Sequence, residues 1–524
     1  MRKIQIYDTT LRDGAQTEGI TFSLRDKLLL AKRMDWMGID FIEGGYPASN
    51  EKDEQFFQRI GEAAPENAVI CAFGMTRRKG MKPEEDAGLR SLIHSGASVL
   101  TIVGKSSSFQ VKEVIQTTLD ENLAMIEDTV RWCVEQGRRL FFDAEHFFDG
   151  WKSDPVYTIQ VLKTAVAAGA ESVHLCDTNG GTLPEEIIAG VEDVLKNISV
   201  PVGIHAHNDC GLAVANSLAA VDAGASIVQG TINGLGERCG NADLIAIIAN
   251  LLLKKKDRYE LLHPDSIREL TAFSRYFYEL LNVNPSNRQP FVGKSAFAHK
   301  GGMHVSGVHR DTSAYEHIAP ESVGNERRVL VSELSGRSNI LARTAKFHFE
   351  NNPAILAKIL DAVVRKENEG YQYEAAEGSF DLLVRKTAGL YHSHFERLSY
   401  QTNVGANENG VFETLATVKL KVGTIIRHEV AEGDGPVDAL NAAMRKALYP
   451  LFPELKDVSL VDYKVRVLNS EAATAAATRV IIESKDLEES WGTVGVNENI
   501  IEASWIALCD SIEYKLAKTR TRNL

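Results

Sequence analysis

The sequence lacks the features that would place it in a membrane, in an oxidising compartment or on nucleic acid. Its 524 residues contain no run of roughly 18 apolar residues and no apolar leader after Met1. The six cysteines are scattered and form no C-x-x-C pair, which argues against a disulfide framework and a structural zinc knot. The formal net charge of -13 disfavours nucleic-acid binding, because that needs clustered Lys and Arg. We therefore expect a cytoplasmic protein with no membrane and no nucleic acid among its partners.

What the sequence does contain is enough apolar material for more than one core. Hydrophobic residues make up 44% of the chain and charged residues 25%, which is ordinary for a globular protein. A chain of 524 residues is too long for a single core, so we expect two or three domains. We predict a first domain at 1–260, a helical linker subdomain at 261–372 and a third domain at 373–524.

The first half of the chain alternates between strand-like and helix-like hydrophobic patterns. Apolar, β-branched runs predict strands at 4–7, 41–43, 69–73, 99–103, 140–144, 173–176, 202–205 and 227–232. Helical spacing lies between them, at 24–37, 119–135, 156–168, 184–195 and 212–223. Eight strand–helix units in about 250 residues are typical of a (β/α)8 TIM barrel. The alternative, an open doubly wound sheet, usually has fewer strands and a Gly-rich phosphate loop after the first one, which is absent here.

The pattern changes after Leu253. Helices are predicted at 266–282 and 353–368, with loops between them. Beyond about 375, strands are predicted at 380–384, 412–422, 425–430, 460–467 and 478–484, and helices at 437–448 and 499–515. The predicted fold class is therefore α/β, with an N-terminal (β/α)8 barrel, a helical linker and a C-terminal α+β domain.

Polar side chains gather where three of the predicted barrel strands end. His205 and His207 are two positions apart at the end of a strand, so both can face one point. Asp13 follows the first strand, and Asn241 lies in a Gly-rich segment after the eighth. Strands one, seven and eight are neighbours in a closed barrel, so these four side chains can converge on a catalytic divalent metal ion. Polar capping of a strand is the alternative for an isolated His-x-His pair, and the residues do not choose among Zn, Mn, Mg and Co.

Three further residues at strand ends are candidates for substrate chemistry. Arg12 precedes Asp13 and is interpreted as a fork for a carboxylate or a developing alkoxide, rather than as a surface ion pair. Thr178 follows the sixth strand and can bind a carboxylate, although it can equally cap the helix that follows. Glu145 ends the fifth strand and faces either the solvent or the site, where it can act as an acid or base.

A Gly-rich loop outside the predicted barrel contains two histidines. The segment 296–304 includes His299 and His304, and Tyr315 follows it. A histidine in such a loop is most often structural. Two histidines with two glycines nevertheless indicate a piece that folds over the barrel mouth.

Five motifs in order give the chain a resemblance that covers its whole length. It resembles the acyl-CoA-condensing branch of the metal-dependent lyase-type TIM barrels, which includes isopropylmalate, homocitrate and citramalate synthases. Within this family, segment 42–53 is most similar to the long form of citramalate synthase. The matching segments are 8–14, 205–209, 234–241, 296–304 and 315–324.

The resemblance implies roles for the candidate residues. Asp13, His205 and His207 would hold the ion, with Asn241 as a fourth ligand or just behind the other three. Arg12 and Thr178 would bind a 2-keto acid. The remaining catalytic candidates are Glu145 and His304, either of which would be the base, with Tyr315 in support.

The resemblance also implies substrates, regulation and assembly. Acetyl-CoA and pyruvate would give (R)-citramalate on the route to isoleucine, and isoleucine would act as the feedback ligand of an allosteric regulatory domain at 373–524. The segment at 261–372 would carry a lid, and the protein would be a homodimer. Three alternatives stay open: a synthase for a larger 2-keto acid, such as isopropylmalate or homocitrate synthase, an aldolase or lyase on the same barrel, and an amino-acid sensor with an inactive barrel.

Overall fold

The computed structural model describes residues 1–261, 266–330, 339–340, 343–349, 352–406, 412–468 and 476–522. The chain forms two compact units. Unit 1 comprises Met1–Phe297 and Ile318–Glu326, and unit 2 comprises Ala298–His317 and Arg327–Leu524. Because this is a division into two units rather than three, the domain boundaries near 260 and 372 stay a prediction.

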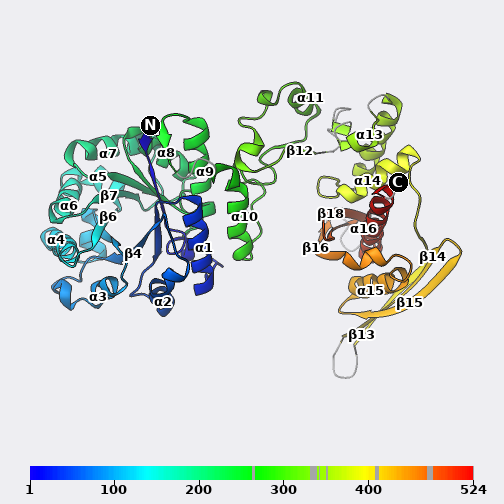
Figure 1. Cartoon of the computed structure of the whole chain (residues 1–524), viewed down its shortest axis with the longest axis horizontal. Coiled ribbons are helices and arrows are strands. Elements are labelled where there is room, and N and C mark those ends of the chain that lie inside the picture. Colours follow the sequence, from blue (N-terminus) through cyan, green and yellow to red (C-terminus); the bar gives the residue numbers. More distant parts are fainter. Residues whose placement is uncertain are drawn as a thin grey trace. The chain divides into compact units, whose positions relative to one another are not determined.

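Unit 1 is built on a closed barrel of eight parallel strands, which confirms the predicted fold class (Figure 1). Each strand pairs with the next along the chain, and the last pairs with the first to close the ring. A short pair, β1 (Arg2–Lys3) and β10 (Tyr259–Glu260), lies outside the barrel. The barrel strands are β2 (Gln5–Asp8), β3 (Phe41–Gly45), β4 (Val69–Met75), β5 (Val99–Lys105), β6 (Arg139–Glu145), β7 (Ser172–Asp177), β8 (Val202–Ala206) and β9 (Ile227–Gly230).

Helices surround the barrel, and their ends follow from local sequence. Ser23 begins the first helix with a capping box that includes Asp26, and Gly38 ends it in a left-handed conformation. In the part of the chain that the structure describes, no helix is both long and apolar enough to cross a bilayer. The helices of unit 1 are α1 (Leu24–Met37), α2 (Glu51–Arg59), α3 (Ala87–His94), α4 (Leu119–Glu135), α5 (Phe147–Ser153), α6 (Pro155–Ala168), α7 (Pro184–Asn197), α8 (Ala213–Ala223), α9 (Leu244–Ala249) and α10 (Leu270–Leu280).

The interior of the barrel changes from apolar to polar towards the C-terminal ends of the strands. On β3, β6 and β9, an inward-facing apolar residue is followed two positions later by a buried polar residue, because alternate side chains face inward. These polar residues are Glu43, Asp143 and Gln229. The apolar layer below them consists of Tyr7, Phe41, Cys71, Val99, Phe141 and Ile227.

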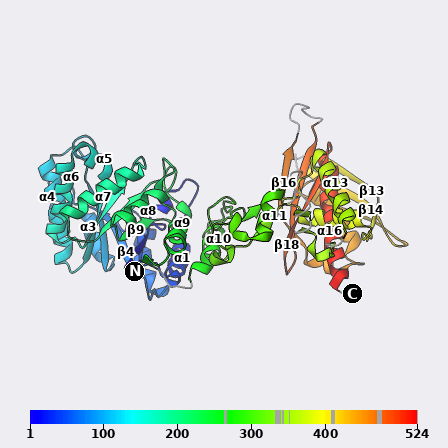
Figure 2. The same cartoon turned by 90° about the horizontal axis from the view of Figure 1, so that it is seen from above.

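Unit 2 contains two three-stranded antiparallel sheets with helices between them (Figure 2). Helix α15 (Pro436–Leu448) packs on one sheet and α16 (Ile500–Arg522) on the other, and the two helices contact each other. Each sheet therefore buries one face. The sheets are β13 (Glu396–Ala406), β14 (Phe412–Val422) and β15 (Ile425–Gly433), and β16 (Ser459–Val467), β17 (Thr478–Lys485) and β18 (Ser490–Asn497).

One segment of unit 2 has a different secondary structure from the one predicted. The strand predicted at 380–384 is wrong, because these residues lie within helix α14 (Glu377–Ala388). Phe380 and Val384 are four positions apart, so they share one side of a helix, where they pack with Ile359 and Val363. Ile359 and Val363 lie on α13 (Pro353–Asn368). Unit 2 also contains α11 (Gly302–Arg310), β11 (Ala298–His299) and β12 (Arg328–Val329).

Candidate metal centre

The predicted metal ligands lie where the barrel strands end. His205 is on β8, and His207 follows the last residue of that strand. His207 forms an antiparallel bridge with Asn241, which ties the loop after β9 to the end of β8. Asp13 stands in the turn after β2, where its backbone N–H donates to the Thr9 carbonyl at 2.8 Å. Three segments far apart in the sequence thus meet at the mouth of the barrel.

Three side chains present ligand atoms to one point. His205 Nε2 lies 3.3 Å from His207 Nε2 and 3.4 Å from Asp13 Oδ2. One ligand atom from each residue lies within 4.8 Å of the others. All three residues are buried. This group can hold a metal ion, and the predicted alternative of two unrelated polar caps does not account for its convergence.

Burial and charge set the protonation of this group. Burial would raise the pKa of Asp13, but Arg12 and the two histidines oppose it and lower the pKa to about 2. Burial, followed by repulsion from His205, lowers the pKa of His207 to about 4. At neutral pH the group therefore contains a carboxylate and a neutral imidazole, which are the forms that bind a divalent ion.

Asn241 places a buried amide beside the three candidate ligands. Its Nδ2 donates to Asp13 Oδ2 at 2.8 Å. Its buried Oδ1 has no hydrogen-bond partner among the described residues. Gly236 makes room for this oxygen, because a Cβ at Gly236 would lie 2.0 Å from it. An orphaned oxygen beside a carboxylate and two imidazoles fits a divalent ion.

Arg12 is fixed inside the mouth rather than on the surface. Its Nε pairs with the buried carboxylate of Glu43. Its guanidinium lies 3.9 Å from the centre of the Phe73 ring. Its Nη2 reaches to 3.6 Å from Asp13 Oδ2. The interpretation of Arg12 as a surface ion pair is therefore wrong, and its charge is held next to the candidate ligands.

Glu145 and Thr178 line the same small cavity as Arg12, Asp13 and the two histidines. Glu145 pairs with Lys105, so its carboxylate has a cationic neighbour. Thr178 Oγ1 accepts a hydrogen bond from the His146 N–H at 2.9 Å. Its alternative role as the cap of α7 is not observed, since that helix begins at Pro184. The chemical roles of both residues stay predictions.

His304 and Tyr315 belong to unit 2. His304 is on α11, and its ring stacks on that of Tyr315 with centroids 4.3 Å apart. Both side chains are exposed. Because they lie in a different unit from the barrel, their role over its mouth stays a prediction.

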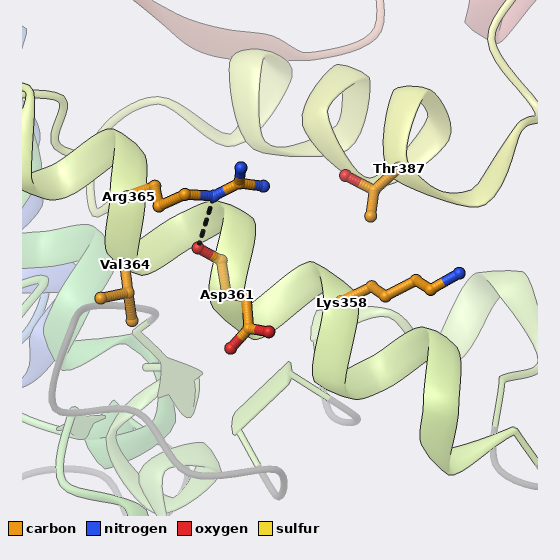
Figure 3. Close-up of a pocket in the computed structure, with 5 residues that line it drawn as sticks. All are labelled: Lys358, Asp361, Val364, Arg365 and Thr387. Atoms are coloured by element: carbon orange, nitrogen blue, oxygen red, sulfur yellow. Dashed lines mark hydrogen bonds between the residues drawn. The ribbon is translucent and has the colours of Figure 1, made fainter.

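A second hollow, on unit 2, has a different chemical character. Five residues of α13 and α14 line it, and within α13 Arg365 Nε donates to the Asp361 carbonyl at 3.4 Å (Figure 3). The five include one carboxylate and no histidine: Lys358, Asp361, Val364, Arg365 and Thr387. This hollow offers no group of metal ligands, so the candidate chemistry centres on the barrel mouth.

Three buried supporting residues were not predicted as part of the site. Glu43 holds Arg12, and Gln229 joins His205 to Asp143. Each lies two positions after an inward-facing apolar residue of the same barrel strand. A buried-strand pattern that ends in a polar side chain is the signal that could have identified them.

Known families match the chain along most of its length. The HMGL-like family matches residues 3–273. The homocitrate synthase post-HMGL domain-like family matches residues 291–370. The LeuA allosteric (dimerisation) domain matches residues 374–516.

Curated relatives extend over nearly the whole chain. (R)-citramalate synthase of Geobacter sulfurreducens is 48% identical over 522 residues, which cover 99% of this chain and 98% of the relative. (R)-citramalate synthase of Aquifex aeolicus is 48% identical, with 98% of each chain covered. 2-Isopropylmalate synthase of Methanocaldococcus jannaschii is 30% identical, with 98% of this chain and 95% of the relative covered. As the resemblance in the sequence predicts, the chain belongs to the citramalate synthase family, which lies within the HMGL-like proteins. The members of the citramalate synthase family are acyltransferases.

Proposed function

We propose that this protein condenses acetyl-CoA with pyruvate and then hydrolyses the thioester, to give (R)-citramalate and free CoA. The observation that carries the proposal is a full-length, 48% identical likeness to proteins of that name, combined with a complete ligand group at the barrel mouth. An amino-acid sensor with an inactive barrel would have no need of that group.

We assign the ligand role to Asp13, His205 and His207, with Asn241 Oδ1 as the fourth candidate. A divalent ion held there supplies a Lewis acid for the ketone of the 2-keto acid. The donors include both nitrogen and oxygen, so Zn, Mn, Mg and Co all stay candidates. Calorimetric titration of the metal-free protein with each ion ranks the ions by affinity.

Arg12 and Thr178 would orient the keto acid. The guanidinium of Arg12 is held by Glu43 and Phe73, so it can donate to the ketone oxygen as negative charge develops there. The Thr178 hydroxyl accepts from a backbone N–H and still has its own proton to donate to a carboxylate. Both groups therefore stabilise charge without having to move.

The base that removes the methyl proton of acetyl-CoA would be Glu145 or His304. Glu145 lines the same cavity as the ligand group, whereas His304 is in unit 2 beside Tyr315. Loss of the base makes proton removal rate-limiting. We therefore compare Glu145→Gln with His304→Ala. The variant that lacks the base should release CoA more slowly. It should also show a larger isotope effect with acetyl-CoA deuterated at the methyl group.

The barrel mouth has room for two substrates of unequal size. The cavity at the ligand group is about 270 Å³. A larger one of about 970 Å³ shares Met75, Val103 and Glu145 with it. The small cavity suits a compact keto acid, and the neighbouring one suits a bulkier thioester.

A panel of keto acids tests the proposed substrate directly. With acetyl-CoA and a thiol reagent, we expect kcat/KM for pyruvate to exceed that for 2-oxoisovalerate by about 10-fold or more, because each extra carbon must fit the pocket. A preference for the larger acid would favour an isopropylmalate synthase. Absence of CoA release with every acid would favour a lyase or aldolase.

We propose isoleucine as the inhibitor of this reaction, bound to the domain at 374–516, and a homodimer as the assembly. The match of that domain to the LeuA allosteric (dimerisation) family supports both proposals. Inhibition measured with isoleucine, leucine and valine distinguishes the effector. Inhibition by leucine alone would contradict the choice of isoleucine and its pathway.

A further inference from the structure

A buried polar network lies beneath the candidate metal ligands. It consists of Gln229 on β9, Asp143 on β6 and His174 on β7, which are 0%, 3% and 0% exposed. Asp143 lies at the floor of the cavity beside the ligand group, whereas Gln229 and His174 are not among the residues that line it. The proposed reaction uses none of the three. Buried polar groups need partners, so their connection to His205 has to be explained.

The network links one ring nitrogen of His205 to the barrel interior. His205 Nδ1 lies 2.8 Å from Gln229 Oε1. Gln229 Nε2 donates to Asp143 Oδ1 at 3.0 Å. His174 Nδ1 lies 2.7 Å from the same carboxylate oxygen, and Ser172 Oγ lies 3.1 Å from His174 Nε2. Each partner is thus held by another buried side chain.

This arrangement determines which way the Gln229 amide faces. Gln229 Nε2 lies 3.0 Å from Asp143 Oδ1 and 2.6 Å from His174 Nδ1. A carboxylate oxygen only accepts hydrogen bonds, so the NH₂ group of Gln229 faces Asp143, and His174 Nδ1 is its second acceptor when the His174 ring proton is on Nε2, beside Ser172 Oγ. The amide oxygen then faces His205 Nδ1, which can satisfy it only by carrying the ring proton. His205 Nε2, on the opposite side of the ring, is left with its lone pair. That nitrogen is the one that lies near Asp13 and His207.

We propose that Gln229, anchored by Asp143, is a positioning residue that locks His205 in the tautomer able to bind the metal ion. The proposal rests on the ligand role assigned to His205 under the proposed function. Partners that orient a ligating histidine commonly contribute about 10- to 100-fold to metal affinity.

Divalent metal binding to the metal-free full-length protein tests the inference. Gln229→Met keeps the shape of the side chain but removes the acceptor, and should weaken binding by about 10- to 100-fold. Thr101→Val is the control, because Thr101 is equally buried in the barrel and bonds to Tyr7 rather than to the network. It should bind the metal like the wild type, and wild-type affinity in Gln229→Met would overturn the inference.

A reciprocal exchange distinguishes a specific acceptor from general packing. Gln229→Glu combined with Asp143→Asn swaps the amide and the carboxylate, and still offers His205 Nδ1 an acceptor. This double variant should bind the metal within about 3-fold of the wild type, well above Gln229→Met. Binding as weak as that of Gln229→Met would contradict a role as acceptor.

The tautomer of His205 can also be observed directly in the wild-type protein. Nitrogen NMR of histidine-labelled, metal-free protein should show His205 protonated at Nδ1, with His205→Ala used to assign its signals. A proton on Nε2 would overturn the inference. His205→Ala should also lose metal binding. If His205→Ala binds the metal normally, the proposed ligand group is wrong. If His205→Ala loses metal binding but Gln229→Met binds normally, only the role of Gln229 is contradicted.

Discussion

At the scale of single residues, burial and neighbouring charge prepare the barrel mouth for a cation. The pKa of Asp13 is lowered to about 2 and that of His207 to about 4. Neither group has to lose a proton at neutral pH before it binds a divalent ion. Arg12 is fixed beside them, so its positive charge is available to stabilise the negative charge that we propose develops on an oxygen of the substrate.

Removal of one ligand tests the assignment of the metal site. We expect Asp13→Ala or His207→Ala to reduce kcat/KM by about 10³-fold or more, because Lewis-acid stabilisation contributes several kcal/mol. Circular dichroism should show that both variants stay folded. His94→Ala, at the exposed end of α3, is the matched control and should retain full activity. Retained activity in either ligand variant would refute the assignment.

Asp8 gives the barrel a pH-dependent cost. It is buried and accepts from the Thr10 N–H at 2.9 Å and the Thr10 hydroxyl at 2.8 Å. Burial raises its pKa from 3.8 to about 7, although the Thr10 bonds oppose this. The pKa of Asp8 is higher in the folded protein than in the unfolded chain. The stability that protonated Asp8 contributes is therefore fully present below about pH 4, and it is lost as the pH rises through 7 and the buried carboxyl group ionises.

Asp8→Asn should remove that dependence, because an amide does not ionise. Compared with the wild type, the variant should gain stability between pH 5 and pH 8, by at most about 4 kcal/mol. Urea unfolding of both proteins at the two pH values measures the difference. If the variant and the wild type change in parallel with pH, Asp8 does not titrate as described.

At the scale of elements, loops rather than strands shape the mouth. The strand ends supply His205, but Asp13, His207 and Asn241 lie beyond the strands, in turns that the backbone must hold in place. Glycine makes one of these turns possible. At Gly236, a Cβ would collide with Asn241 Oδ1 at 2.0 Å.

Gly236→Ala should therefore displace the Asn241 amide and weaken divalent metal binding by about 10-fold. Gly181→Ala is the matched control, since Gly181 lies in another loop of the mouth and an added Cβ would meet nothing within 4 Å. Calorimetric metal titration compares the two variants. Equal affinities would show that the close approach at Gly236 does not hold the fourth candidate ligand in place.

Repetition along the chain is what made the barrel predictable. Eight strand patterns separated by amphipathic helices allow few arrangements, and the structure confirms the closed barrel. The C-terminal region is less regular. There, the strand predicted at 380–384 is a helix, because short apolar runs suit either structure until tertiary packing decides. Strand β13 was not predicted, because its sequence is mostly polar and contains no apolar run.

The site was predictable only in part, for a related reason. His205, His207 and Asp13 stand in short polar motifs at strand ends, which the sequence displays. Glu43 and Gln229 act through partners that are 31 and 24 residues away, namely Arg12 and His205. Such pairs become visible only once the barrel brings neighbouring strands together.

At the scale of the whole molecule, unit 2 presents a sheet face with apolar side chains in solvent. On β15, Ile426 and Val430 are 55% and 47% exposed and, four positions apart, face the same way. Leu415 on β14 is exposed as well. Since this region matches the LeuA allosteric (dimerisation) domain, we expect a second copy of the chain to cover this face.

Ile426→Asp combined with Val430→Asp should weaken the dimer by about 100-fold or more, because it places two charges in an apolar interface. Sedimentation over a range of protein concentrations measures the dissociation constant. Leu487→Asp is the control, because Leu487 is 87% exposed and lies in a turn between β17 and β18. An unchanged dimer in the double variant would place the interface elsewhere.

The central claim is that a divalent ion held at the barrel mouth activates a 2-keto acid for attack by acetyl-CoA. Removal of metal by a chelator, followed by assay of CoA release from acetyl-CoA and pyruvate, tests it most directly. The account predicts that turnover is lost in the stripped protein and returns when a single divalent ion is added back. Full turnover in protein shown by elemental analysis to be free of metal would contradict it.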